Sequence, residues 1–173
     1  VDVAQRVDHP NAVRTFDHGS LAGQPYSAME FVEGVALNML IEEGAVDLAF
    51  FADVAVPVVD ALAAIHAAGL VRRDVKPGNV MMICGGVCGG CPRVEPAAVK
   101  LMDFWIAGST LLSRLTVTGA RVGTPAYMAP EQVRGETMQL ASDVYGLSFV
   151  FYEMLTGETA FEGTYEAVVH QRV

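Results

Sequence analysis

The sequence predicts an α+β fold, and apolar segments of two different lengths carry this prediction. Residues 45–68 and 142–156 are long and apolar nearly all round, which is typical of helices buried inside a domain. Two short apolar runs, 13–17 and 26–32, flank a glycine-rich stretch at 19–23 and predict an antiparallel hairpin. At 173 residues the chain is long enough to form one domain with a core of its own.

Shorter patterns predict the remaining elements. These are the end of a helix at 1–8, closed by His9-Pro10, short strands at 80–83 and 98–102, and short helices at 35–42, 129–134 and 164–173. Gly69 and Gly157 are expected to end the long helices, since glycine accepts the left-handed backbone found there. Ser142 is the expected N-cap of the second long helix. Pro57 lies inside the first, where a proline costs about 3 kcal/mol or causes a kink. His66 is interpreted as a packed or surface histidine rather than a ligand.

The composition argues against several classes of partner. The net charge is −9 and the isoelectric point is near 4.8, which disfavours nucleic acid and anionic membrane and favours a cytoplasmic protein. No window of 18 residues is both apolar and free of charge, so we predict no membrane span and no membrane contact from this segment. The first residues have neither the basic region nor the apolar run of a signal peptide.

The stretch V-R-R-D-V-K-P-G-N-V, residues 71–80, carries the clearest chemical signal. Its proline and glycine exclude a regular helix or strand, so its polar side chains are expected on a loop. Asp74 could accept a hydroxyl proton, Lys76 could hold phosphoryl oxygens, and Asn79 could bind Mg²⁺. Such a set suits phosphoryl transfer, which depends on positioning and charge neutralisation. Taken alone, the pattern is also compatible with a surface turn that carries scattered charges.

Three further motifs follow in a fixed order. They are L-M-D-F-W at 101–105, G-T-P-A-Y-M-A-P-E-Q at 123–132 and S-D-V-Y-G-L at 142–147. With the loop, they resemble the protein kinase family, in particular the bacterial serine/threonine kinases of eukaryotic type. The resemblance extends from His9-Pro10-Asn11 to about Gly163. It implies the α-helical C-terminal lobe of a kinase with a remnant β-hairpin of the N-terminal lobe.

The resemblance implies a role for each polar residue of these motifs. Asp74 would be the catalytic base, Lys76 would steady the γ-phosphate of ATP, and Asn79 and Asp103 would hold Mg²⁺. Lysine two residues after the aspartate is the serine/threonine pattern. The A-P-E match at 129–131 is generally lacking in small-molecule kinases, so a protein substrate is expected.

The N-terminal part resembles the nucleotide-binding hinge of the family. Met29, Glu30 and Val32 match the strand end and hinge whose backbone holds adenine. The same residues would also suit a plain core hairpin. The implied division is 1–32 for the end of the N-terminal lobe, 33–36 for the hinge and 37–173 for a partial C-terminal lobe.

The resemblance also implies regulatory residues. Arg73, directly before Asp74, marks kinases that are activated by phosphorylation of the activation loop. Thr116 and Thr118 lie where bacterial relatives carry such phosphothreonines, and the alternative is that they are solvent-facing loop threonines. Thr124 matches the threonine that ties its segment to Asp74 and Lys76. Asp143 matches an aspartate that braces the backbone of the catalytic loop.

A cysteine-rich insertion interrupts the family pattern at 84–97. Its cysteines, Cys84, Cys88 and Cys91, are odd in number and do not suit a secreted disulfide framework. The spacing is compatible with a flexible surface insertion, with a zinc site that lacks an obvious fourth ligand, or with an iron–sulfur cluster.

Other departures bear on activity. Arg72 replaces the histidine that usually begins the catalytic-loop motif, and Trp105 replaces the glycine of D-F-G. Val35-Ala36 stands where relatives often offer a polar group to the ribose. The glycine-rich loop and the strand lysine would precede Val1, so we expect this chain alone not to phosphorylate protein at a useful rate. The alternative to an enzyme is a pseudokinase or scaffold that binds partners without catalysis, and a metal-binding module built on the cysteines is a third reading.

Overall fold

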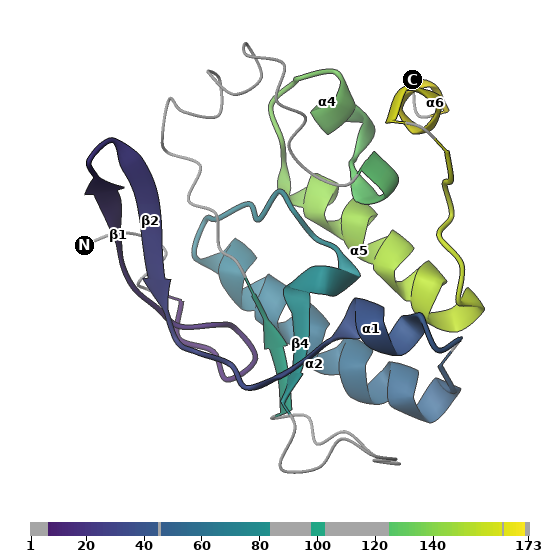
Figure 1. Cartoon of the computed structure of the whole chain (residues 1–173), viewed down its shortest axis with the longest axis horizontal. Coiled ribbons are helices and arrows are strands. Elements are labelled where there is room, and N and C mark those ends of the chain that lie inside the picture. Colours follow the sequence, from purple (N-terminus) through teal and green to yellow (C-terminus); the bar gives the residue numbers. More distant parts are fainter. Residues whose placement is uncertain (1–6, 45, 84–97, 103–124, 164, 172–173) are drawn as a thin grey trace.

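The computed structural model describes residues 7–44, 46–83, 98–102, 125–163 and 165–171. A two-stranded hairpin stands beside a body made of helices and a small three-stranded sheet (Figure 1). The α+β class predicted from the sequence is therefore confirmed.

The hairpin consists of β1, Thr15–Leu21, and β2, Gln24–Met29, which pair in antiparallel fashion. Ala22 and Gly23 form its tip with φ of 51° and 80°. Two residues with positive φ give a type I′ turn, whose twist matches that of the flanking strands. The hairpin prediction is confirmed, but the turn is tighter than the predicted stretch 19–23 because β1 continues to Leu21.

The second sheet has the antiparallel order β3-β4-β5. Its strands β4, Val80–Ile83, and β5, Val99–Leu101, lie where the sequence predicted strands. The prediction of a helix at 35–42 is partly wrong, because β3 occupies Gly34–Ala36 and helix α1 begins only at Leu37 and ends at Ile41.

Gly34 explains why a strand forms at the start of this segment. A Cβ atom at this position would lie 2.2 Å from the carbonyl oxygen of Met82. Only glycine therefore lets β3 approach β4 closely enough to pair. This tertiary pairing overrides the local helical pattern.

Helix α2 covers Leu48–Ala67 and begins three residues later than predicted. Asp47 caps it, because its Oδ1 accepts a hydrogen bond from the backbone N–H of Phe50 at 2.7 Å. The helix continues through the buried Pro57. Gly69 follows with φ of 78° and ends the helix as predicted.

Helix α5 covers Leu140–Thr156. The prediction of Ser142 as its N-cap is wrong: the cap is Gln139, and the Ser142 hydroxyl lies one turn inside, where it accepts a bond from the Gln139 N–H at 3.0 Å. Gly157, with φ of 74°, ends the helix as predicted.

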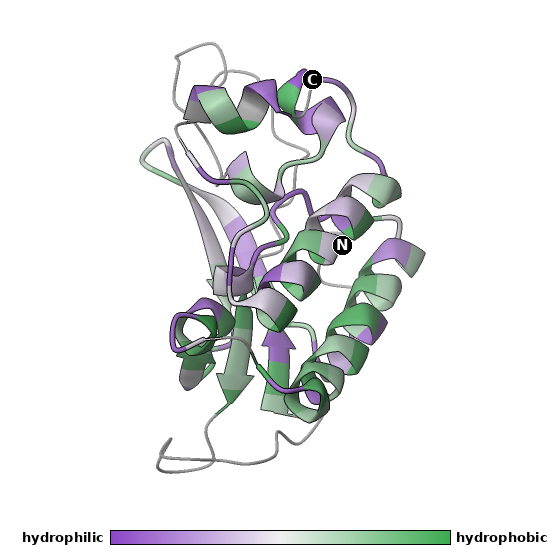
Figure 2. Ribbon diagram, turned by 90° about the vertical axis from the view of Figure 1, so that its right-hand side faces the viewer, coloured by the Kyte–Doolittle hydropathy of each residue, from purple (hydrophilic) through white to green (hydrophobic). Residues whose placement is uncertain are grey.

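The core lies between α2, α5 and the three-stranded sheet, and Figure 2 shows the two helices running side by side. It is formed by aliphatic side chains from every layer, among them Leu37, Val54, Val58, Ile65, Val80, Val99, Leu101, Val150 and Met154. Burial of this kind of surface is the main favourable term in folding.

The expectation that α2 is buried on nearly all sides is wrong. Leu48, Val56 and Val59 are 76%, 61% and 45% exposed. Among the described helices, α2 is the one long and apolar enough to cross a membrane by length and composition. A core helix passes the same test, and the opposite face of α2 packs against β5 and α5.

The C-terminal part contains a 3₁₀ turn, Pro125–Tyr127 (η4), and helices α4, Pro130–Val133, and α6, Tyr165–His170. Both short helices were predicted, with wider bounds. At the other end, residues 7 and 8 are not helical, so the predicted helix is not found in the described part of 1–8.

Candidate active site

Three polar side chains predicted from the loop at 71–80 converge. Lys76 Nζ lies 2.7 Å from Asp74 Oδ2, and Asn79 Nδ2 donates to the same oxygen at 3.1 Å and to the Asp74 carbonyl at 2.9 Å. A 3₁₀ turn, Pro77–Asn79 (η2), brings the asparagine back toward the aspartate. The Asp74 side chain is 43% exposed. An ion pair this accessible adds little to the stability of the fold. Its effect is to hold the accessible Asp74 carboxylate beside the Lys76 ammonium, where both can meet a substrate.

Asp143, on α5, holds the loop from inside the body. Its Oδ2 accepts from the Arg72 N–H at 2.7 Å and its Oδ1 from the Arg73 N–H at 2.8 Å. His66 Nε2, on α2, lies 2.8 Å from Oδ2. Asp143 is 1% exposed, so these partners supply the hydrogen bonding that a buried carboxylate requires. His66 is therefore a packed histidine with a structural partner.

The loop is strained at the residue before Asp74. Arg73 has φ of 70°, a left-handed conformation that costs a non-glycine residue about 1–2 kcal/mol. The carbonyl oxygen of Arg73 accepts a bond from Gln132 Nε2, on α4, at 2.7 Å. Contacts from two helices thus hold a backbone conformation that the chain would not adopt alone.

A glycine lets α5 approach the loop. A Cβ at Gly146 would lie 3.2 Å from the carbonyl oxygen of Tyr127 and 3.3 Å from Val75. These distances are shorter than ordinary van der Waals contact. Gly146 follows Asp143 by one helical turn, so the close approach brings the aspartate within reach of the loop.

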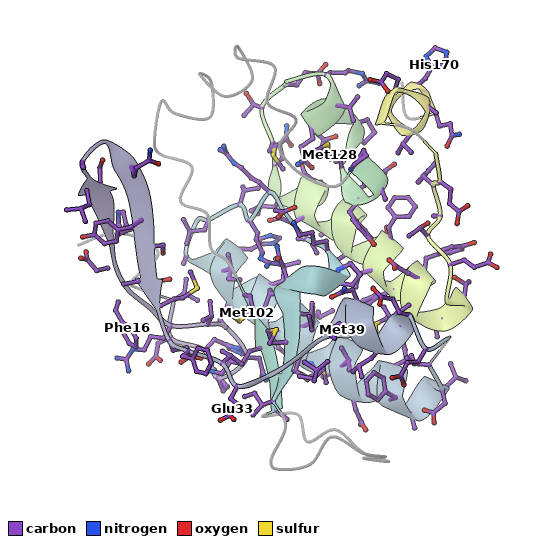
Figure 3. All side chains as sticks on the ribbon, in the orientation of Figure 1. Phe16, Glu33, Met39, Met102, Met128 and His170 are labelled. Carbon is purple, nitrogen blue, oxygen red and sulfur yellow. The ribbon has the colours of Figure 1, made fainter. Side chains whose placement is uncertain are left out.

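Arg72 lies inside the protein with 1% of its surface exposed. Its guanidinium donates to the Met102 carbonyl and lies 3.4 Å from the Asn79 carbonyl. Met102 is near the centre of the view in Figure 3. The partners of this buried cation are the backbone of the loop and of the residue that precedes Asp103.

The donor set for a metal is only partly described. Asn79 Nδ2 is used by Asp74, which leaves Oδ1 to meet a cation as far as the described residues are concerned, and oxygen is the ligand that Mg²⁺ prefers. Asp103 lies outside the described residues. Within the described ranges, no group of three or more His, Cys, Asp or Glu side chains could hold a metal ion.

The predicted hinge residues lie at the base of the hairpin. Met29 and Val32 pack against the core. The carboxylate of Glu30 forms a 2.5 Å ion pair with Lys100 on β5. This pair links the residue after β2 to β5, the strand that Met102 directly follows.

A cavity of about 310 Å³ opens beside this ion pair. Its lining combines apolar side chains with charges of both signs, from Val7, Asp8, His9, Pro10, Ala12, Arg14, Glu30 and Lys100. It lies on the side of Glu30 that faces the N-terminal segment and contains none of Asp74, Lys76 and Asn79.

Residues 125–131, called here the A-P-E segment, are attached to α5 by two side-chain bonds. The Ser142 hydroxyl donates to Glu131 and lowers the pKa of that carboxyl. The Tyr127 hydroxyl donates to Glu153 at 2.5 Å. Burial raises the pKa of Tyr127, with a further contribution from Glu153, and burial also raises the pKa of Glu153.

Several predicted residues lie outside the described residues. They are Asp103, Trp105, Thr116, Thr118, Thr124 and the insertion cysteines Cys84, Cys88 and Cys91.

Comparison with known proteins identifies the family of the chain. The protein kinase domain model matches residues 1–173, so the chain belongs to the protein kinase family. The resemblance stated from the motifs is confirmed.

The relatives are bacterial serine/threonine kinases. The chain is 38% identical to the probable serine/threonine-protein kinase PknB of Corynebacterium glutamicum, over 97% of this chain and 26% of the relative. It is 38% identical to the serine/threonine-protein kinase PknL of Mycobacterium tuberculosis, over 91% and 37%. It is 39% identical to the probable serine/threonine-protein kinase PknB of Bifidobacterium longum, over 99% and 25%. The chain thus spans between a quarter and somewhat over a third of these relatives.

Proposed function

We propose that this chain is the catalytic part of a serine/threonine protein kinase, which transfers the γ-phosphoryl group of Mg·ATP to a hydroxyl group of a protein. One observation carries the proposal: Asp74, Lys76 and Asn79 meet on a loop whose backbone Asp143 holds. The names of the relatives support the serine/threonine class.

In this proposal, each side chain acts where its chemistry suits the reaction. The Asp74 carboxylate accepts the proton of the attacking hydroxyl. The Lys76 ammonium offsets charge on the transferred group. Asn79 Oδ1 and the Asp103 carboxylate would hold Mg²⁺, which supplies charge neutralisation at the phosphates.

The proposal assigns the nucleotide to the base of the hairpin. The backbone of Glu30 and Val32 would hold adenine, with Met29 beside it. Residues 1–32 would then be the end of the N-terminal lobe, 33–36 the hinge and 37–173 a partial C-terminal lobe. Since the reaction consumes ATP, we place the chain in the cytoplasm.

We further propose that phosphorylation at Thr116 or Thr118 activates the site through Arg73. In the part of the chain that the structure describes, Arg73 Nε is buried and has no hydrogen-bond partner. A phosphate would bring roughly two negative charges to such a guanidinium. Thr124 would tie the same segment to Asp74 and Lys76. Phosphopeptide mapping after incubation of the complete gene product with ATP tests this, and absence of phosphate at both threonines would refute it.

A pseudokinase is the second candidate, favoured by Arg72 and Trp105 in place of the usual histidine and glycine. The two candidates differ in whether Asp74 is needed for phosphoryl transfer. A pseudokinase would bind its partners equally well without this carboxylate.

The test replaces the base with an amide in the complete gene product. Asp74→Asn should lower kcat by at least about a hundredfold, because an amide cannot take up the proton. Asp60→Asn, the same change on an exposed part of α2, is the control and should leave kcat unchanged. Transfer of radiolabelled phosphate to a protein substrate is measured. Equal rates for wild type and Asp74→Asn would refute the proposed function.

A further inference from the structure

We propose that Gln132 is a positioning residue for Asp74, because its side-chain amide fixes the peptide bond that immediately precedes the aspartate. Gln132 lies in α4, directly after the A-P-E motif. The proposal rests on the proposed function of Asp74 as the base.

The amide of Gln132 uses both of its ends. Nε2 donates to the carbonyl oxygen of Arg73 at 2.7 Å, across 59 residues of sequence. Oε1 accepts from the backbone N–H of Ala129 at 3.1 Å. One side chain therefore joins the start of α4 to the peptide group that links Arg73 and Asp74.

This contact completes the restraint of Arg73. Its N–H is held by Asp143 and its carbonyl by Gln132, so both peptide groups that flank its left-handed backbone are fixed. The orientation of the second peptide group sets the direction in which the Asp74 side chain leaves the backbone. Without the bond from Gln132, the strained backbone of Arg73 could relax by rotation of the peptide group that joins it to Asp74.

The contacts that restrain Arg73 form a closed network, because the two helices that hold Arg73 are also bonded to each other. Gln132 holds the Arg73 carbonyl, and Asp143 holds the Arg73 N–H. The residue before Asp143, Ser142, donates to Glu131, the residue before Gln132. Helices α4 and α5 thus each bond the loop through one residue, and they bond each other through the residue that precedes it. A shift of α4 would therefore be transmitted to the peptide that carries the base.

The two bonds of Gln132 can be separated by substitution. In Gln132→Glu a carboxylate oxygen can still accept from Ala129, but the group that faces the Arg73 carbonyl can no longer donate. Gln132→Met keeps the length of the side chain and removes both bonds. Gln24→Glu, the same chemical change in the exposed β2 strand of the hairpin, is the matched control.

Two measurements test the proposal. The first is steady-state phosphoryl transfer by the complete gene product, with KM for ATP and kcat determined separately. The second is amide hydrogen exchange at Arg72 and Arg73. If Gln132 positions the base, Gln132→Glu and Gln132→Met should both lower kcat by about ten- to a hundredfold with little change in KM for ATP. Both should speed exchange at Arg73, and Gln24→Glu should match the wild type.

The outcomes separate the proposal from its alternatives. If Gln132 only caps α4, Gln132→Glu should keep the wild-type kcat because the bond to Ala129 survives, and that result would overturn the proposal. If wild type and Asp74→Asn show equal transfer, the proposed function fails. Amide hydrogen exchange at Arg73 then tests, independently of activity, whether Gln132 restrains Arg73. Faster exchange at Arg73 in both variants would support it, and unchanged exchange would overturn it.

Discussion

The loop that carries Asp74 and the β1–β2 hairpin are held in opposite ways. The loop has a strained backbone, which side chains from α4 and α5 fix, and His66 on α2 supports the Asp143 carboxylate. The hairpin is a two-stranded antiparallel ladder with one irregularity between Thr15 and Asp17, and its hydrogen bonds run mainly between its own two strands. Phe16, Leu21 and Tyr26 remain largely exposed on it, and it stands apart from the helical body in Figure 1.

The residues directly before β1 and directly after β2 attach the hairpin to strand β5 of the body. The segment before β1 pairs with β5, since Val13 N–H donates to the Leu101 carbonyl at 2.9 Å and Leu101 N–H to the Asn11 carbonyl at 2.7 Å. The ion pair of Glu30 and Lys100 adds a side-chain link. The loop is thus held by tertiary contacts within the body, whereas the hairpin is attached to the body through its base.

The largest expected effect comes from removing the charge that holds the loop. Asp143 accepts from His66 and from the backbone N–H groups of Arg72 and Arg73. In Asp143→Asn only one oxygen remains as an acceptor, and the new amide N–H₂ group faces a donor that has lost its partner. We expect the free energy of unfolding to fall by about 3 kcal/mol, because buried donors lose a charged acceptor. Urea denaturation of the chain measures this loss. Asp60→Asn is the control, and a loss no larger than its own would show that Asp143 does not hold the loop.

The sequence was sufficient to predict the polar set of the loop. A proline and a glycine between Lys76 and Asn79 exclude regular structure, so three side chains within six residues had to lie close together. Helix ends were predictable where glycine takes a left-handed conformation, as at Gly69 and Gly157. These features depend on residues near one another in the chain.

The features that could not be predicted from the sequence depend on contacts between residues far apart in the chain. The bond from Gln132 to Arg73 spans 59 residues, and Ala129 at the N-cap removes the serine or threonine that would mark a capping box. Strand β3 exists because Gly34 fits against Met82. For Arg72, only the fold shows that the side chain is buried and that its guanidinium meets the carbonyls of Met102 and Asn79.

The second prediction concerns the pH dependence of the attachment between the A-P-E segment and α5. Burial raises the pKa of Glu153 above its ordinary value of 4.5, so the folded state binds this proton more tightly than the unfolded chain does. The free energy of unfolding should therefore fall as pH rises from 4.5 through the raised pKa. Glu153→Gln keeps an acceptor for Tyr127 and should lack this decrease.

Urea midpoints measured for both proteins from acid to neutral pH check the prediction. Glu158→Gln, at an exposed position just after α5, is the control and should follow the wild type. Parallel pH profiles for wild type and Glu153→Gln would contradict it.

The smallest expected effect is on the hairpin side. Lys100→Met keeps the length of the side chain and removes its ion pair with Glu30, whose side chain is 25% exposed. The Lys100 side chain is 17% exposed, so the pair lies between a surface pair and a buried one, and its loss should cost on the order of 1 kcal/mol, less than in Asp143→Asn. Amide exchange should nevertheless become faster in β1 and β2 and stay unchanged at Arg72 and Arg73. Glu33→Gln, which removes an exposed charge nearby, should change neither region. Faster exchange at Arg73 in Lys100→Met would mean that the hairpin and the loop are coupled through β5, and the contrast between the two regions would then fail.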